Sequence, residues 1–344
     1  MKNEYTIPIY IEAQNSIFNK LEINNNLTKE SIKNTIDIFL ENIKEENIYK
    51  EVAIFGGSFT SLEKQEQETI LETIYEYIND GKINSIRIST NPKNIDKEEL
   101  KMLKKYKVQT IELSVQTSNN YILGKCKLNY SFEDIKRASK LIKRNGFNLG
   151  FQIMVGLPES TRLDELNTAR DLSKLKPKII RIYPLVVIKN SEIEKEYQEK
   201  EFMPLTLGQA VERCKELYYF FSKKKVSQIH IGYKNADLMN NVKETDIVEG
   251  PYHEAFDVLV EDSIWYDSIV EKIKKFNVKV KEVEISVNPN NTVNILGYEN
   301  ENAKKLKELY EVDVVLNEDE QKSVGKFDIK ILKTYTDFLE ETNV

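Results

Sequence analysis

Small and polar side chains recur in this sequence directly after short apolar runs, where they could bind a ligand. The runs end in the segments FGGSFT, RISTNP, ELSVQT, FQIMVGLPEST and RIYPLVVIK. In the first segment Gly56 and Gly57 expose backbone groups that a ligand can approach closely, with the Ser58 hydroxyl beside them. In the second, the Ser89 and Thr90 hydroxyls suit hydrogen bonds to a sugar. These two segments predict recognition of a polar small molecule.

The other three segments offer complementary chemistry. Gln116 carries both a donor and an acceptor, and Gly156 leaves room for a flat ring against the backbone. Arg181 and Tyr183 suit a carboxylate and the edge of a ring. Each motif taken singly is also typical of ordinary turn chemistry or of a structural hydrogen bond. Five polar strand ends in succession favour a pocket.

Residues that bind transition metals are scarce. The chain has two cysteines, Cys126 and Cys214, and two histidines, His230 and His253. A zinc site would need most of these four to converge, and their spacing shows no local cluster. The two cysteines also exclude a disulfide framework and a C-x-x-C motif. From the residues alone we predict no metal site.

The composition is typical of a soluble globular protein with one large domain and an appendage. Of 344 residues, 40% are hydrophobic and 31% are charged, and the formal net charge is −6. Because basic and acidic residues are interspersed, we expect no long-range attraction for nucleic acid, although a local basic patch is compatible with this balance. No run approaches eighteen apolar residues and no signal-peptide core begins the chain, so we expect a cytoplasmic protein without a membrane partner.

An alternation of strands and helices over residues 1–233 must position the polar strand ends. The expected strands are largely apolar, as is typical of parallel strands covered on both faces. They cover residues 7–11, 52–55, 85–89, 110–115, 149–155, 179–183 and 228–231.

Helix signals lie between these strands. Thr60 with Glu63 and Asp96 with Glu99 have the spacing of capping boxes, and Gly146 follows a helical pattern as a left-handed stop. Strands joined by short helical connections imply right-handed βαβ units. We therefore predict an α/β fold, a closed or partial (β/α) barrel, with an open doubly wound sheet as the alternative.

The pattern changes at residue 234, so we predict a barrel domain over 1–233 and a small α/β appendage over 234–344. A long helix is expected over 252–275 and a second helix over 302–310. The strand patterns are VKEVEISV, TVNILGY, VDVVL and FDIKIL. Asn288-Pro289-Asn290-Asn291 predicts a turn between the first two.

Five long segments, in this order and spacing, resemble the radical S-adenosylmethionine (SAM) proteins related to the catalytic subunit of Elongator. They are FGGSFTSL, IRISTNPKNIDKEELKMLKKYKVQTIELSVQT, GFQIMVGLPEST, KPKIIRIYPLVVIKNSEIEKEYQEKEFMPLTLGQAV and EGPYHEAFDVLVED. More closely, they resemble the stand-alone bacterial branch, which lacks the acetyltransferase domain. The resemblance covers residues 7–297 and implies a partial (β/α)6-type, TIM-like radical SAM barrel.

The resemblance also implies two cofactors. Members of the superfamily hold a four-iron four-sulfur cluster through a C-x3-C-x2-C motif in the loop after the first strand, and this cluster binds and cleaves SAM. The residues that the resemblance assigns to SAM are Gly56, Gly57, Ser58, Ser89, Thr90, Gln116, Met154, Gly156 and Tyr183.

The loop after the first strand departs from the superfamily pattern. Members read approximately Ile-Pro-Ile-Phe-Ile-Pro-His and continue into the cysteine triplet, whereas here IPIYI is followed by EAQNSIFNKLEI. Cys126 and Cys214 cannot substitute, because three thiolates are needed, and oxygen ligands such as Glu12 do not suit iron–sulfur chemistry. We therefore predict that the cluster is absent, which leaves SAM as the candidate cofactor.

Two further departures lie on the same face. Members commonly carry Arg-Gly-His-Thr where this chain has LNYS at residues 128–131, and they carry Arg in place of His230. Losses concentrated at the catalytic mouth, with the scaffold motifs kept, indicate relaxed catalytic demand. We expect His230 to be a structural residue of its strand, and His253, in the first turn of the long helix, to make an interdomain contact.

Three functional hypotheses follow. The first is a pseudoenzyme that acts as partner or regulator of an active radical SAM relative. The second is a SAM-dependent enzyme with polar, cluster-free chemistry, in which Arg87, Arg181 or Lys189 replaces the iron as the anchor for the methionine moiety. The third is a module that binds RNA, in particular tRNA, through KSVGKF, KKYK and SKKK, although solvated lysines at helix ends are the commoner interpretation of such segments.

Overall fold

The computed structural model describes residues 4–11, 27–44, 48–233 and 244–337. The chain divides into two compact units, Met1–Glu254 and Ala255–Val344.

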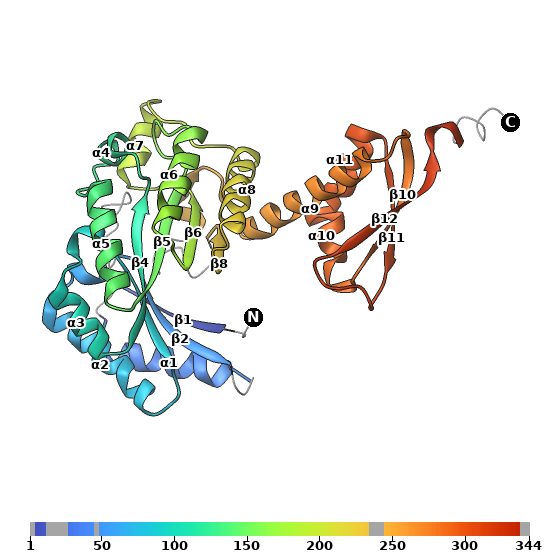
Figure 1. Ribbon diagram of the computed structural model, residues 1–344. Coiled ribbons are helices and arrows are strands. Elements are labelled where there is room, and N and C mark those ends of the chain that lie inside the picture. Colours follow the sequence, from blue (N-terminus) through green and yellow to red (C-terminus); the bar gives the residue numbers. More distant parts are fainter. Residues whose placement is uncertain (1–3, 12–26, 45–47, 234–243, 338–344) are drawn as a thin grey trace. The chain divides into compact units, whose positions relative to one another are not determined.

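A seven-stranded parallel sheet forms the centre of the first unit (Figure 1). Each strand pairs in parallel with the next one along the sheet. The strands are β1 (Glu4–Tyr10), β2 (Tyr49–Phe55), β3 (Ser85–Thr90), β4 (Val108–Gln116), β5 (Asn148–Val155), β6 (Ile179–Pro184) and β8 (Gln228–Ile231). All seven expected strands are confirmed.

The order of the strands in the sheet, β1-β2-β3-β4-β5-β6-β8, follows the chain. Sequential right-handed crossovers place the connecting helices on one face, and the sheet curls into a half-barrel. A doubly wound sheet would need a reversal of strand order, so the partial barrel is confirmed and the alternative is wrong. The helices are α1 (Lys29–Asn42), α2 (Lys64–Asn79), α3 (Lys97–Lys105), α4 (Asn120–Lys125), α5 (Phe132–Arg144), α6 (Arg162–Lys174), α7 (Glu192–Gln198) and α8 (Leu207–Lys223).

Local sequence explains where several of these helices begin and end. Reciprocal capping boxes start α1, α5, α6 and α8. Asp96 caps α3 by accepting a hydrogen bond from the Glu99 amide at 2.8 Å, and Gly146 follows α5 in the left-handed region. The capping box expected at Thr60 is wrong. This residue lies in a 3-10 turn, Phe59–Ser61, and its hydroxyl bonds Thr90 instead.

A short antiparallel pair extends the first unit beyond the half-barrel. It joins β7 (Val187–Ile188) to β9 (Ile247–Glu249), which follows a 3-10 turn at Glu244–Asp246. Residues 244–254 therefore belong to the first unit, whereas the sequence pattern placed the boundary at residue 234. The local sequence pattern does not show this pairing, because β7 and β9 lie far apart in the sequence, with α7 and α8 between them.

The second unit packs helices on a three-stranded sheet. Its central strand β10 (Val280–Val287) is parallel to β11 (Asp313–Glu318) and antiparallel to β12 (Phe327–Thr334). The helices are α9 (Phe256–Lys274), α10 (Thr292–Leu296) and α11 (Glu301–Tyr310), with 3-10 turns at Pro289–Asn291 and Tyr298–Asn300. Its core includes Trp265, Val283, Ile285 and Phe327. His253, expected in the first turn of the long helix, precedes α9.

The strand expected at TVNILGY is wrong, because residues 292–296 form α10. Tertiary hydrogen bonds determine the conformation here. The buried Asp262 carboxylate accepts from the Tyr298 amide at 2.6 Å, and the Asn302 side chain donates to the Asn294 carbonyl at 3.1 Å. The turn expected at Asn288 is confirmed, since its side chain accepts from the Asn290 amide.

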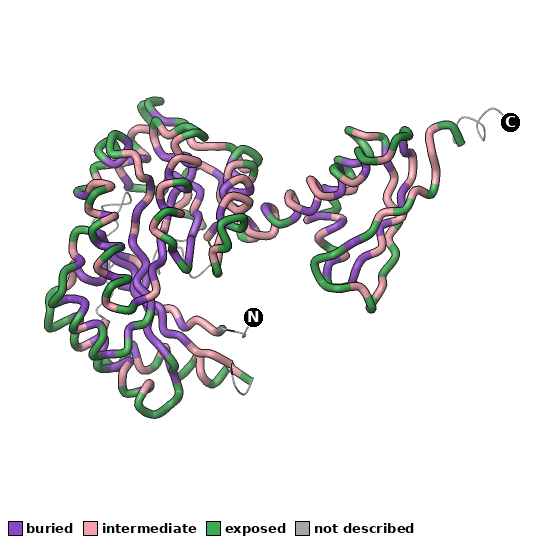
Figure 2. Tube along the Cα trace, in the orientation of Figure 1, coloured by how far each residue is buried: buried purple, intermediate pink, exposed green. Residues whose placement is uncertain are grey.

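Figure 2 shows burial concentrated on the strands of the first unit and exposure on the outer faces of its helices. Five residues of β2 and all six of β3 are buried. Within the ranges described, no helix combines the length and the apolar character needed to cross a bilayer.

Candidate ligand site at the strand ends

A buried ionic network joins β3, β4 and β6. Glu112, in the middle of β4, is fully buried. Its carboxylate accepts from Arg87 Nη1 at 2.9 Å and from Arg181 Nε at 2.9 and 3.1 Å. Gln152 on β5 donates to the same carboxylate at 3.0 Å. The Phe55 ring contacts both guanidinium groups, with its centroid 5.7 Å from Arg87 Cζ and 5.0 Å from Arg181 Cζ.

Electrostatics keep this carboxylate ionised. Burial alone would raise the pKa of Glu112, but the Arg181 and Arg87 charges outweigh burial and lower the pKa to about 2. Arg87 also lies 2.9 Å from the Glu51 carboxylate and donates to Thr6. Both arginines are thus committed to protein carboxylates, and neither offers an unsatisfied charge to the carboxylate of a ligand.

The hydroxyls at the ends of β2 and β3 bond one another. Thr90, fully buried, lies 3.1 Å from the Ser58 hydroxyl and also accepts from the Thr60 amide. The Ser58 hydroxyl in turn accepts from the Asn91 amide at 3.0 Å. These side chains tie two strand ends together, so Ser58 and Thr90 have a structural role whether or not a ligand binds.

Gly56 has a structural role as well. Its φ is +104°, and a Cβ there would lie 2.3 Å from the Ile11 carbonyl oxygen. The backbone that approaches Gly56 closely is therefore the end of β1, which donates from Ile11 to the Phe55 carbonyl. Gly57 is buried beside it.

At the ends of β3 and β4, one side chain predicted to bind a ligand is hydrogen-bonded within the protein, and one is available to a ligand. The Ser89 hydroxyl accepts from Gln152 at 2.8 Å. Gln116 is half-buried at a register break of β4, with φ of +60°. Over the part of the chain that the structure describes, its side-chain amide makes no hydrogen bond. Gln116 is the predicted polar site residue best placed to bind a ligand.

The ends of β5 and β6 are more crowded than expected. A Cβ on Gly156 would lie 2.9 Å from Leu205, so a leucine occupies the space expected for a flat ring, and the Gly156 amide donates to Glu165. Met154 is buried in an apolar cluster, against which Tyr183 packs. Tyr183 stacks on Tyr233 with the ring centroids 5.1 Å apart.

Neither cysteine is placed as a metal ligand would be. Cys214 is fully buried in α8, where burial and then Glu165 raise the pKa of its thiol well above the ordinary value. Burial and then Glu196 raise the pKa of Cys126, after α4, to about 11. A cysteine binds a metal as the thiolate, and the environments of these two cysteines disfavour the thiolate. Within the described ranges, no group of three metal-binding side chains is arranged around one point. The cysteine-free loop at residues 12–26 lies outside the described residues.

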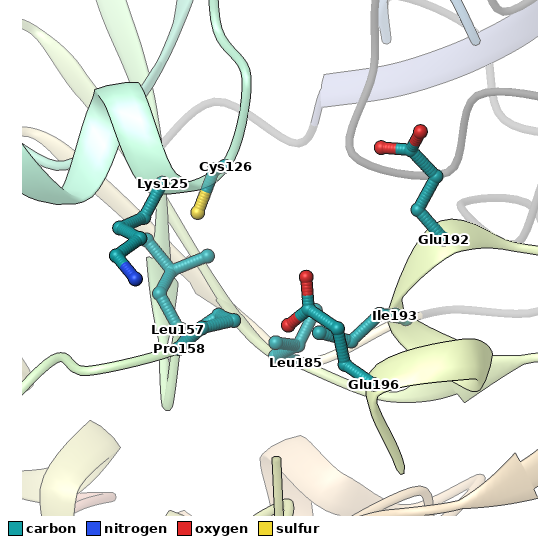
Figure 3. Close-up of a pocket in the computed structure, with 8 residues that line it drawn as sticks. All are labelled: Lys125, Cys126, Leu157, Pro158, Leu185, Glu192, Ile193 and Glu196. Carbon is teal, nitrogen blue, oxygen red and sulfur yellow. The ribbon is translucent and has the colours of Figure 1, made fainter. Parts of the chain in front are cut away.

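A pocket opens beside these strand ends, between the segments that follow β4, β5 and β6 (Figure 3). Its volume is about 30 Å³, room for about one water molecule. We call it the α4–α7 pocket. It is lined by Lys125, Cys126, Leu157, Pro158, Leu185, Glu192, Ile193 and Glu196.

Sequence reasoning missed the residues that shape this site most. Glu112, Gln152, Leu205 and Glu196 were not singled out. Glu112 had a detectable signal, because a charge inside an apolar parallel strand needs a buried partner. Arg87 lies on the adjacent strand β3, and Arg181 lies on β6, one strand beyond β5. Leu205 and Glu196 had none, since only the folded connections bring them to the strand ends.

Comparisons with known proteins agree with this architecture. The profile of the radical SAM superfamily matches residues 15–172, and that of the radical SAM C-terminal domain matches residues 177–266. The solved structure of an Elp3 from the archaeon Methanocaldococcus infernus superposes with a TM-score of 0.62 at 21% identity, over 79% of this chain and 64% of that one.

Curated relatives match more locally. A tRNA uridine(34) acetyltransferase of Methanocaldococcus infernus is 26% identical over 185 residues, which is 47% of this chain and 34% of the relative. A heme chaperone HemW of Lactococcus lactis is 25% identical over 159 residues, or 44% of this chain and 42% of the relative. The match thus spans less than half the length of either relative.

Proposed function

This chain belongs to the radical S-adenosylmethionine superfamily, and on that basis we propose that it is an Elongator-like member that has lost the iron–sulfur cluster. The observation that carries this proposal is the cysteine count. Only Cys126 and Cys214 are present, and the superfamily's cluster requires three thiolates. The raised pKa of each thiol supports the same conclusion. The residues present do not fit the cluster.

We propose further that the protein acts by binding, as partner or regulator of an active radical SAM relative in the same cell. The seven strands of the half-barrel are all formed, and inside it the Glu112 carboxylate pairs with Arg87 and Arg181. A pseudoenzyme of this kind keeps the surface of its relatives while losing their chemistry.

Three measurements test these two proposals. After anaerobic reconstitution with iron and sulfide, we expect a preparation without the broad visible absorbance of a cluster and without stoichiometric iron. After incubation with SAM and a reductant, we expect no 5′-deoxyadenosine. A brown, iron-loaded protein that cleaves SAM would refute the loss of the cluster. The partner role requires a complex with a cysteine-containing relative, measured by ultracentrifugation, and its absence would refute that role alone.

The alternative, a SAM-dependent enzyme with polar chemistry, draws its support from the unengaged amide of Gln116 at a strand end. Against it, two of the three cations that could anchor the methionine moiety are bound by Glu112. The third, Lys189, is exposed. Calorimetry with SAM and metal-free protein decides between the two interpretations. Saturable binding that Gln116→Ala weakens would favour the enzyme, and we expect no such binding.

A further inference from the structure

Four helix-to-strand connections of the first unit carry positive charge and no negative charge. They join α3 to β4, α5 to β5, α6 to β6 and α8 to β8. Counted from the last residues of each helix, they are residues 104–107, 143–147, 173–178 and 222–227. Together they contain eleven lysine and arginine residues and no aspartate or glutamate. All eleven of these residues are exposed.

The fold brings the four connections together. Strands β4, β5, β6 and β8 are parallel neighbours in the sheet (Figure 1), so the connections that precede them meet at the amino ends of these strands. Two hydrogen bonds join one connection to the next. Lys104 Nζ donates to the Asn145 carbonyl at 3.2 Å, and Lys143 Nζ donates to the Leu175 carbonyl at 3.0 Å. We call these four segments the basic face.

The protein itself neutralises little of this charge. Lys174 pairs with Asp171 at 2.8 Å. Lys104, Lys105 and Lys143 donate to uncharged oxygen atoms. The other seven cations form no ion pair and no hydrogen bond with any residue that the structure describes. Because like charges on adjacent connections repel one another, an anionic partner would be attracted to this face.

Helix dipoles account for only part of the pattern. Cations in the last turns of α3, α5, α6 and α8 interact favourably with the negative ends of these helices. Lys107, Lys176 and Lys225 lie beyond those last turns, at φ of +63°, +55° and +59°, a conformation that favours glycine. Neither the helix ends nor the backbone conformation explains lysine at these three positions.

The rest of the chain limits the length of polyanion that fits the basic face. The net charge of the whole chain is −6, so the residues outside the face carry a net charge of −17. A long polyanion such as RNA would extend beyond the face and be repelled by this remainder. The face spans three strand spacings of about 4.8 Å, roughly 14 Å, which about four extended residues cover. A short acidic segment therefore fits within the face.

The side chains between the cations also favour a protein partner. Stacking on nucleic-acid bases requires exposed aromatic rings, and the aromatic residues of the face, Tyr106 and Phe147, are buried. Insertion into a bilayer requires exposed apolar side chains. None of the large exposed hydrophobic residues within the described ranges lies in the face.

We propose that the basic face binds a short acidic segment of a partner protein, whose carboxylates pair with the lysines that have no partner within the chain. Many exposed ion pairs, each weak, together provide the recognition. The proposal does not depend on the loss of the cluster, because the face lies at the opposite ends of the strands from the residues assigned to SAM. The segments KKYK and SKKK, considered from sequence for RNA binding, fall within the face.

Labelled octaglutamate, octaglutamine and octauridylate test the class of partner, with binding to the full-length protein followed by fluorescence anisotropy. We expect saturable binding of octaglutamate that weakens steeply as salt rises from about 50 to about 200 mM, and no binding of octaglutamine. Absence of saturable octaglutamate binding would overturn the proposal. Tighter binding of octauridylate, of tRNA or of phosphatidylserine vesicles than of octaglutamate would overturn it as well, and would identify the other class of partner.

A matched pair of variants tests the location. The first removes four cations of the basic face: Lys176→Gln, Lys178→Gln, Lys224→Gln and Lys225→Gln. The second has the same net charge and removes four exposed lysines elsewhere in the first unit: Lys29→Gln, Lys97→Gln, Lys101→Gln and Lys200→Gln. We expect octaglutamate to bind the first variant at least about tenfold more weakly than the native protein, and the second within about twofold. Equal losses would show that net charge rather than this face determines binding, and would refute the proposal.

Protection from acetylation gives a second readout that needs no substitution. Octaglutamate should slow the reaction of Lys176, Lys178 and Lys225 with acetic anhydride and leave that of Lys29 and Lys97 unchanged. Mass spectrometry of the lysine-containing peptides measures these rates. Equal protection of both sets at saturating octaglutamate, or protection of neither, would place the binding elsewhere and contradict the proposal.

Discussion

Glu112 places a full negative charge inside the half-barrel, where Arg87 from β3 and Arg181 from β6 pair with it. Removing one member of a buried ion network leaves the others desolvated and unpaired. Substituting one member therefore lowers the free energy of unfolding by more than the intact network contributes to it.

Glu112→Gln should lower the free energy of unfolding by about 3–5 kcal/mol, because Arg87 and Arg181 would stay buried without their shared counter-charge. Urea unfolding followed by circular dichroism measures the loss. Glu76→Gln is the control, since Glu76 pairs with Lys33 on an exposed surface and its loss should cost less than about 1 kcal/mol. Equal losses in the two variants would show that the network contributes no special stability.

The same carboxylate should make stability depend on pH. Its pKa is about 2 in the folded protein, against an ordinary value of 4.5 for a solvated glutamate, so the folded state favours the ionised form. The contribution of Glu112 is therefore fully present above pH 4.5 and is lost as the pH falls toward 2. The difference in stability between the native protein and Glu112→Gln should shrink over this range. A difference that stays constant from about pH 6 to about pH 3 would contradict this explanation.

Side-chain hydroxyls and close backbone packing hold neighbouring strand ends together. Ser58, Thr60 and Thr90 join β2 to β3, and the end of β1 lies against Gly56. The motif FGGSFT, interpreted from sequence as a ligand segment, thus has a packing role. That role explains its glycine without any ligand.

Gly56→Ala tests this packing role. The substitution imposes both an unfavourable positive φ and a collision with the Ile11 carbonyl, whereas Gly81→Ala, at φ of +70°, imposes only the first because nothing lies within 4 Å. We expect Gly81→Ala to cost about 1–2 kcal/mol and Gly56→Ala to cost about 1–3 kcal/mol more. Thermal denaturation measures both. Similar losses would show that β1 moves away from residue 56 without penalty.

At the scale of the whole molecule, each unit has its own core, and one natural probe reports on the second. Trp265 is the single tryptophan and packs on Phe327, 5.5 Å away between ring centroids. The buried Cys214 thiol reports on the first unit. Unfolding of the two units can therefore be followed separately.

Ile285→Ala should lower the stability of the second unit by about 2–5 kcal/mol, because Ile285 is fully buried in its core. The tryptophan fluorescence transition should shift to lower urea concentration, while exposure of the Cys214 thiol keeps its midpoint. Identical shifts of both transitions would instead show that the two units unfold as one cooperative block.

The distribution of charge bears on the RNA-binding hypothesis. Acidic residues outnumber basic ones in the second unit, which contains KSVGKF, and Lys322 of that segment pairs with Asp328. Phosphate binding would require unpaired cations. We therefore do not favour this hypothesis, which a steep salt dependence of tRNA binding would revive.

Local sequence patterns were sufficient to predict the seven parallel strands, the partial barrel, the start of α3, the end of α5 and the number of thiols. Apolar runs, capping residues and residue counts carry this information without reference to distant parts of the chain. The strand expected at TVNILGY is wrong because two hydrogen bonds outweigh the local pattern: the Tyr298 amide donates to Asp262, and the Asn302 side chain donates to the Asn294 carbonyl.

Which polar residues serve the protein itself, and which are available to a ligand, became clear only from the folded arrangement. Ser58, Ser89, Thr90 and Arg181 were interpreted from sequence as groups that bind a ligand, yet each is bound by another side chain. Glu196, unremarkable in the sequence, has its carboxylate at an apolar pocket. A side chain's capacity to bind is set by its neighbours in space, and residues from separate strands and connections become neighbours only when the half-barrel closes around them.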